Sequence, residues 1–130
     1  MNIETLIYNV FKAEHTATYR MNAPTPGTGT YIVLDMISDI TTMSKDIATM
    51  SAPGGRIRMQ ARVYSDDTDT ARSLIEQCAT IIRTTANYTD TDVTWIFAQD
   101  TAGIQGGYST KDNRFYYIID FITHYITFST

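Results

Sequence analysis

The sequence contains few lysine, glutamate and cysteine residues, and these shortages exclude or disfavour some classes of protein. Cys78 is the one cysteine among 130 residues, so no internal disulfide forms and a secreted disulfide scaffold is excluded. Lys and Glu occur three times each, and the net charge is −4 at pH 7. Binding to phosphate groups requires concentrated positive charge, so this balance argues against nucleic acid as the main partner. Scarce lysine also leaves few of the charges that keep the edge strands of sheets apart.

Long apolar runs are also missing. The first residues, Met1 to Glu4, carry no basic leader, and no apolar run is long enough for a signal peptide or a membrane span. We therefore expect a protein that is made and used in a cytosol, or in something assembled there, with no membrane partner. The length predicts a single domain over residues 1–130, which buries about two thirds of the surface of the extended chain.

No pattern of residues typical of catalysis occurs. His15 and His124 lie far apart without the spacing of metal ligands, so we expect structural roles for both. The acidic run at residues 66–69 is interpreted as a helix cap, because it lacks the glycine and the distant glutamate of a calcium loop. The glycine-rich residues 103–107 open no helix and so predict no phosphate site. We expect no catalytic residue, no metal, no cofactor and no enzymatic activity.

The most informative segment runs from Gly55 to Arg83. Residues 56–64 alternate strictly between apolar and polar side chains, which predicts a half-buried strand of an antiparallel sheet. The next apolar residues recur at the spacing of one helix face. They are Ala71, Leu74, Ile75, Cys78, Ala79 and Ile82. On this face, Cys78 is expected to be a reduced core residue.

Similar patterns predict the other regular elements. A helix is predicted over residues 2–14, and strands are predicted at residues 30–40, 93–98 and 114–128. The order of elements predicts the α+β class, with a single, mostly antiparallel sheet of four or five strands and two helices packed on one of its faces.

Three segments between these elements lack a clear period. Residues 41–55 are compatible with an irregular hairpin or a mobile arm, and their methionines, Met43 and Met50, suit adaptable interface contacts. Residues 84–91 are polar and turn-like. Residues 99–113 are rich in glycine and predict a long hairpin loop.

The arginines of the alternating strand are the clearest group of like charges. They could pair with carboxylates on neighbouring strands, such as Asp35 or Asp120. They could instead form a protein–protein surface, because arginine is enriched and lysine depleted at interface cores. Contact with nucleic acid is a weaker third interpretation. The candidate partner interface consists of Arg56, Arg58, Arg62, Met43, Met50 and Tyr108.

Several segments occur in an order that resembles a known family. A helix begins at Ile3, a Pro/Gly loop leads into the strand at residues 31–34, and the basic strand at residues 56–64 passes into a helix. The chain closes with the aromatic strand at residues 115–121. In this order and spacing, the chain resembles the tail terminator, or tail completion, proteins of long-tailed bacteriophages.

The resemblance implies a structural protein of the virion. Such proteins form rings, usually hexameric, that bind the last ring of tail-tube subunits, stop polymerisation and offer a docking surface to the head–tail connector. It implies a homo-hexamer at the head-proximal end of the tail, assembled in the host cytoplasm, with DNA present only in transit through the lumen. Asp100 and Asp112 are candidates for acidic residues that face this lumen. The alternatives are a head-completion or neck connector protein and a cytosolic α+β dimer that binds a small molecule.

Overall fold

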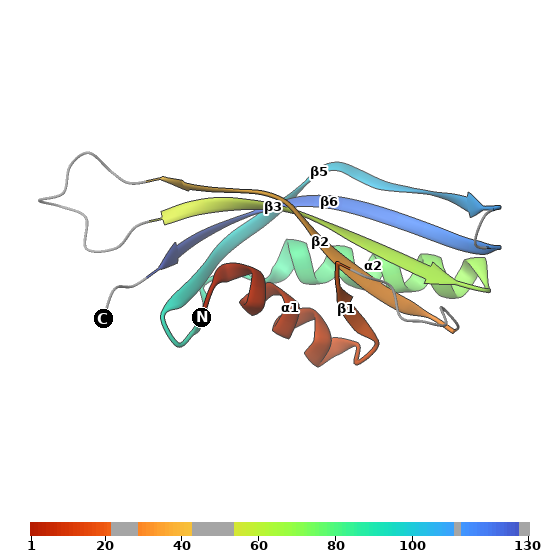
Figure 1. Ribbon diagram of the computed structural model, residues 1–130, viewed down its shortest axis with the longest axis horizontal. Helices are drawn as coiled ribbons and strands as arrows, with labels where there is room; N and C mark the ends of the chain where they lie inside the picture. The colour runs from red at the N-terminus through yellow and green to blue at the C-terminus, as the bar shows by residue number, and fades with distance from the viewer. Residues whose placement is uncertain (22–28, 43–53, 111–112, 128–130) are drawn as a thin grey trace, which may run out of the picture.

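The computed structural model places two helices and six strands among the residues that it describes (Figure 1). It describes residues 1–21, 29–42, 54–110 and 113–127, with only the backbone of residues 41 and 42. The elements are α1 (Ile3–Glu14), β1 (Thr18–Arg20), β2 (Tyr31–Thr42), β3 (Gly54–Ser65), α2 (Thr68–Thr84), β4 (Tyr88–Asp90), β5 (Val93–Ser109) and β6 (Arg114–Thr127).

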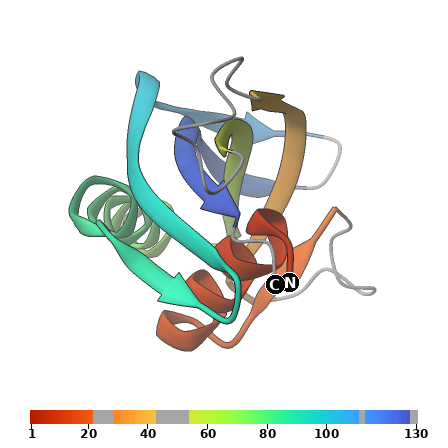
Figure 2. The same cartoon turned by 90° about the vertical axis from the view of Figure 1, so that its left-hand side faces the viewer.

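All the described strands belong to one sheet, in the order β1-β2-β3-β6-β5-β4. β1 pairs with β2 in parallel, and the other neighbours pair antiparallel. Figure 2 shows that the sheet is strongly curled. The α+β class is as expected from the sequence, but the expectation of four or five strands is too low for this six-stranded sheet. β1 and β4 are three residues long, too short to show a period of two, and β4 lies in the segment predicted to be turn-like.

Both helices begin at a side-chain cap. The Asn2 side chain accepts a hydrogen bond from the Thr5 N–H at 2.8 Å, and Asp67 accepts one from the Thr70 N–H at 3.0 Å. Such caps satisfy backbone N–H groups that have no partner within the helix. Hydrogen bonds from the hydroxyl and the backbone N–H of Thr70 lower the pKa of Asp67 from its ordinary value. The interpretation of the acidic run as a helix cap is therefore confirmed.

Both helices pack their apolar stripes against the same face of the sheet, below it in Figure 1. Phe11 from α1 stacks on Phe121 from β6, with ring centroids 5.9 Å apart. Trp95 from β5 and Cys78 from α2 are fully buried in the same core. The core also contains the inward-facing residues of β2 and β3, namely Ile32, Leu34, Ile57, Met59, Ala61 and Val63.

β2 and β3 form an antiparallel pair. The pair includes residues 41–42 and 54–55, which are the two ends of the segment at residues 41–55 that lacks a clear period. Thr42 ends β2 and Gly54 begins β3, whereas residues 43–53 lie outside the described residues. The first four residues of β2, Tyr31 to Leu34, are all buried, and β2 lies between β1 and β3. This agrees with a strand that is apolar on both faces.

The prediction of a long glycine-rich loop at residues 99–113 is wrong. β5 continues to Ser109 and pairs with β6 along most of its length, so the connection to Arg114 is short. At Gly106, a Cβ would lie 2.2 Å from the ring of Tyr117, and at Gly107 it would lie 3.2 Å from the hydroxyl of Tyr116. These glycines therefore belong to a strand, and tyrosine rings from β6 occupy the space that side chains at these two positions would fill.

Candidate interaction surface on the open face of the sheet

The face of the sheet opposite the helices, here called the open face, carries the arginines of β3. Residues paired across neighbouring strands point to the same side of a sheet, so the register defines rows of side chains on this face. Three of these rows contain an arginine from β3. They are Ile40–Arg56–His124–Phe97, Ser38–Arg58–Ile122–Gln99 and Val33–Arg62–Ile118–Gln105.

Two of these arginines form ion pairs across strands. Arg62 Nε lies 2.7 Å from Asp35 Oδ2, and Arg58 Nη2 lies 3.0 Å from Asp120 Oδ2. Gln60 Nε2 donates a hydrogen bond to the other oxygen of Asp120 at 2.9 Å. The pairing with Asp35 and Asp120, which the sequence left open, is therefore present. Since these side chains are partly exposed, each pair contributes about 1 kcal/mol or less.

Arg56 has different surroundings. No ion pair of Arg56 is found within the described ranges of the chain. In its row, the ring of His124 stacks on Phe97 with centroids 4.4 Å apart. Ile40 and Phe97 are 47% and 45% exposed. A cation beside exposed apolar and aromatic side chains is the composition of many protein–protein interfaces.

The other end of the open face is a ladder of tyrosines. Tyr31 stacks on Tyr64 with centroids 5.3 Å apart, and Tyr64 lies 6.4 Å from Tyr116. Tyr19 meets Tyr31 edge-on at 6.2 Å. The guanidinium of Arg114, which is buried, lies 5.2 Å from the ring centroid of Tyr31. The sequence analysis missed this ladder, because tyrosines on four strands become neighbours only once the register is known.

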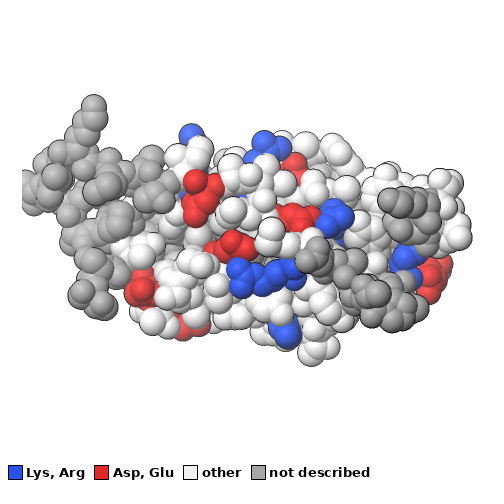
Figure 3. Space-filling model, in the orientation of Figure 1, with Lys and Arg blue, Asp and Glu red and all other residues white. Residues whose placement is uncertain are grey.

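Charges of opposite sign are interspersed on the face shown in Figure 3. Basic and acidic side chains lie beside each other there, and the described part of that face has no extended region of one sign. This arrangement lacks the concentrated positive charge of a nucleic-acid site.

The remaining candidates for the partner interface and for the lumen do not form one group with the arginines of β3. Tyr108, on β5, is 49% exposed and meets Phe115 edge-on at 5.0 Å. Asp100 accepts a hydrogen bond from Arg83 Nη2 at 3.1 Å, which is the main reason its pKa lies below the ordinary value. Three further candidates, Met43, Met50 and Asp112, lie outside the described residues.

The described residues contain no group of three or more His, Cys, Asp or Glu side chains that could hold a metal ion. Burial raises the pKa of the Cys78 thiol to about 12. Of the two described helices, neither combines the length and the apolar character that a membrane crossing requires.

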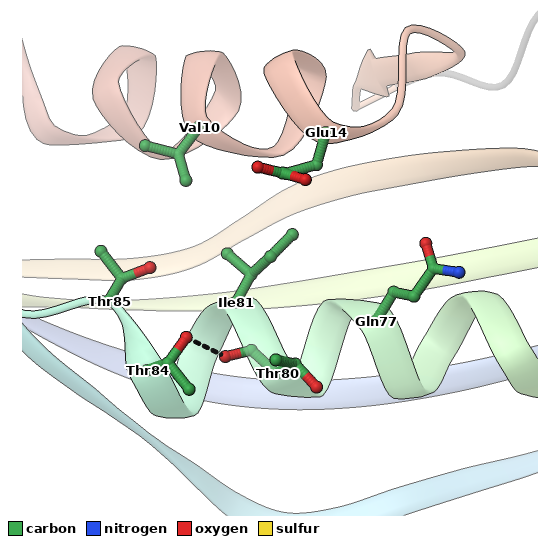
Figure 4. Close-up of a pocket in the computed structure, with 7 residues that line it drawn as sticks. All are labelled: Val10, Glu14, Gln77, Thr80, Ile81, Thr84 and Thr85. Carbon is green, nitrogen blue, oxygen red and sulfur yellow. Dashed lines mark hydrogen bonds between the residues drawn. The ribbon is translucent and has the colours of Figure 1, made fainter.

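A groove of about 420 Å³ separates α1 from α2 (Figure 4). Val10 and Glu14 line it from α1, and Gln77 and Ile81 line it from α2. Three threonines complete the lining, of which Thr84 donates a hydrogen bond to its own helix, to the carbonyl of Thr80 at 2.7 Å. The groove is an open channel between helices, and its lining does not converge on one polar centre.

These features define the class as an α+β fold with a curled sheet, helices on one face and a candidate interaction surface on the other. No family model and no curated protein matches the chain. Among solved structures, it is similar to a chain in the virion of a native gene transfer agent (GTA) particle. The two chains are 14% identical, the TM-score is 0.67, and the match covers 95% of this chain and 94% of the other. At this identity the likeness shows a shared fold.

Proposed function

We propose that this chain is a structural protein of a virion. The observation that carries the proposal is the likeness of its fold to a chain of the GTA virion, over nearly the full length of both. The order of segments that resembles tail terminator proteins supports the same class.

Within this class, the chain acts as a tail terminator. A homo-hexameric ring binds the last ring of tube subunits at the head-proximal end of the tail and covers the surface to which the next subunits would add. Its other side receives the head–tail connector, and DNA crosses the lumen only in transit. The role is structural and involves no catalysis, cofactor or membrane.

The open face supports a role in protein binding. Exposed Ile40 and Phe97 lie in the same row as Arg56, so apolar contact and a charged hydrogen-bond donor are available together. Burial of such side chains drives association, and arginine adds directional bonds to a partner.

Electron microscopy of purified tail tubes incubated with the protein tests this function. We expect ring-shaped density at one end of each tube, and tubes capped in this way should no longer elongate when tube subunits are added. Light scattering of the protein alone should give a mass that rises with concentration towards a ring.

The alternatives predict other results. Binding to isolated head connectors with no binding to tubes would identify a neck or head-completion protein. A strict dimer that binds neither, and that takes a small molecule into the groove between α1 and α2, would identify the cytosolic dimer.

A further inference from the structure

Within the described part of the sheet, two strands have long stretches of outer edge that no neighbouring strand covers. β1 pairs with β2 only at residues 32–34, and no described strand pairs with the outer edge of β2 from Asp35 to Thr42. On the other side of the sheet, β4 pairs with β5 only at residues 93–95. No described strand pairs with the outer edge of β5 from Phe97 to Tyr108. Such edges present backbone donors and acceptors that can pair with another chain.

Neither edge carries the lysine or proline that most often protects such an edge. The two stretches, residues 35–42 and 97–108, contain no Lys, Arg or Pro, and their charged residues are Asp35, Asp39 and Asp100. On β2, exposed apolar side chains lie within the stretch, with Ile37 49% and Ile40 47% exposed. On β5, Phe97 is 45% exposed. Each stretch contains a register shift, between Met36 and Ser38 and between Asp100 and Ile104. Residues 38–42 are the regular segment that remains on β2, and on β5 the regular segment before the shift is residues 97–100.

The two regular segments lie at the same level of the sheet. The rows that cross all four central strands place Ile40 level with Phe97, and Ser38 level with Gln99. Between them, Asp39 is level with Ala98 through Ile57 and Thr123. Three antiparallel pairings separate β2 from β5, so the two strands run in opposite directions. A neighbouring copy placed beside the first in the same orientation therefore brings its β2 edge antiparallel to the β5 edge.

The side chains at this level complement each other. On the open face, Ile40 of one copy meets Phe97 of the next, and Ser38 meets Gln99. On the helix face, Asp39 lies at the level of Ala98; its carboxylate accepts a hydrogen bond from Tyr125 of its own copy at 2.7 Å, and Arg83 is paired with Asp100. The contact thus combines an apolar pair and a polar pair.

We infer that copies of this chain join edge to edge, with Ser38–Ile40 of one copy pairing antiparallel with Phe97–Gln99 of the next. Ile40 lies opposite Phe97, Asp39 opposite Ala98 and Ser38 opposite Gln99. The interface is heterologous, because each copy uses a different edge towards each neighbour, and repetition of such a contact forms a ring when the rotation between neighbours closes. The inference rests on the ring of the proposed function and names its subunit contact.

Cysteine cross-linking tests this register. An equimolar mixture of Ile40→Cys and Phe97→Cys variants, oxidised under mild conditions, should give a disulfide-linked dimer on a non-reducing gel. Each variant alone should stay monomeric on the same gel. The double variant Ile40→Cys/Phe97→Cys should give a ladder of linked copies. Within one copy the two positions are three strand spacings apart, about 14 Å, too far for a disulfide.

Tyr108→Cys is the matched control, because Tyr108 lies on the same strand as Phe97 with similar exposure, 49% against 45%, but at a different level. Mixed with Ile40→Cys, it should give no dimer. Circular dichroism checks that all variants fold.

Each other outcome has a defined meaning. A dimer of Ile40→Cys alone would show a symmetric β2–β2 contact and overturn the inference. Absence of the mixed dimer would also overturn it, whether the protein forms larger assemblies in light scattering or remains monomeric. If rings cap tail tubes without this cross-link, the proposed function survives and the edge contact is wrong. If the cross-link forms but tubes are not capped, the contact stands and the proposed function fails.

Discussion

At the scale of single residues, burial decides the chemistry of Cys78. Its side chain lies on the apolar stripe of α2 and is fully buried. Loss of water around the charged form raises the pKa of the thiol to about 12, from an ordinary value of 9.0. Because the thiolate is the reactive form, the folded protein presents almost none of it near neutral pH.

We therefore predict that Cys78 is protected from a thiol reagent in the native protein. At pH 8, the pKa difference of about three units between 9.0 and about 12 lowers the thiolate fraction by roughly 1,000-fold. Absorbance at 412 nm after addition of Ellman's reagent should rise slowly in buffer and quickly in guanidinium chloride. Rapid, stoichiometric labelling in buffer would contradict the burial of this residue.

The ion pair of Asp100 with Arg83 weakens its candidacy as an acidic residue that faces the lumen. As a lumen-facing acid it would act through an unneutralised charge, but Arg83 lies 3.1 Å from its carboxylate. The pair leaves little net charge at this position, so a repulsion of DNA would depend on other acidic residues.

At the scale of elements, the second half of β5 depends on its neighbour. Gly106 and Gly107 would weaken an isolated strand, since glycine adds flexibility and contributes no side-chain packing. Tyr117 and Tyr116 of β6 lie over them on opposite faces and cover the backbone. The strand therefore forms as part of a pair.

This packing predicts different costs for two adjacent substitutions. Gly106→Ala places a methyl group against the ring of Tyr117, so it should lower the free energy of unfolding by about 1–3 kcal/mol. Gly107→Ala meets only the far end of Tyr116 and should cost clearly less. Urea denaturation followed by tyrosine and tryptophan fluorescence measures both. Equal effects would mean that the tyrosine rings move aside at no cost.

At the scale of the whole molecule, the two faces of the sheet differ in composition. The helix face contains the main apolar core, whereas the open face carries ion pairs, a tyrosine ladder and the row around Arg56. Stability therefore depends mainly on one face, and recognition of partners can use the other.

This division predicts that Arg58→Glu weakens assembly more than folding. Arg58 is partly exposed on the open face, and loss of its pair with Asp120 should lower the free energy of unfolding by about 1 kcal/mol or less. The mass from light scattering, or the occupancy of tube ends in electron microscopy, should fall clearly. Urea denaturation should change little.

Arg72→Glu is the control for charge reversal. Arg72 lies on α2 and pairs with Glu76, with a side chain 49% exposed against 46% for Arg58. It should leave assembly unchanged. An Arg58→Glu protein that does not fold would show that this arginine serves stability rather than partner binding.

The sequence was sufficient wherever structure follows from local period. The alternation over residues 56–64 determined β3 and its buried side, and the helical spacing from Ala71 to Ile82 determined the stripe of α2. Side-chain direction is set by the backbone period within each element, so no distant residue is needed to predict it. The helix cap at Asp67 is local for the same reason.

Only the tertiary structure decided which distant residues meet. Whether Arg58 pairs with Asp120, 62 residues away, depends on the register of β3 against β6. The same register turns a glycine-rich segment into a strand, because tyrosines from β6 take the place of its absent side chains. It also brings Ile40 level with Phe97 on opposite edges of the sheet. Strand pairing joins residues regardless of their separation along the chain, so a local pattern of residues does not predict which strands pair or in which register.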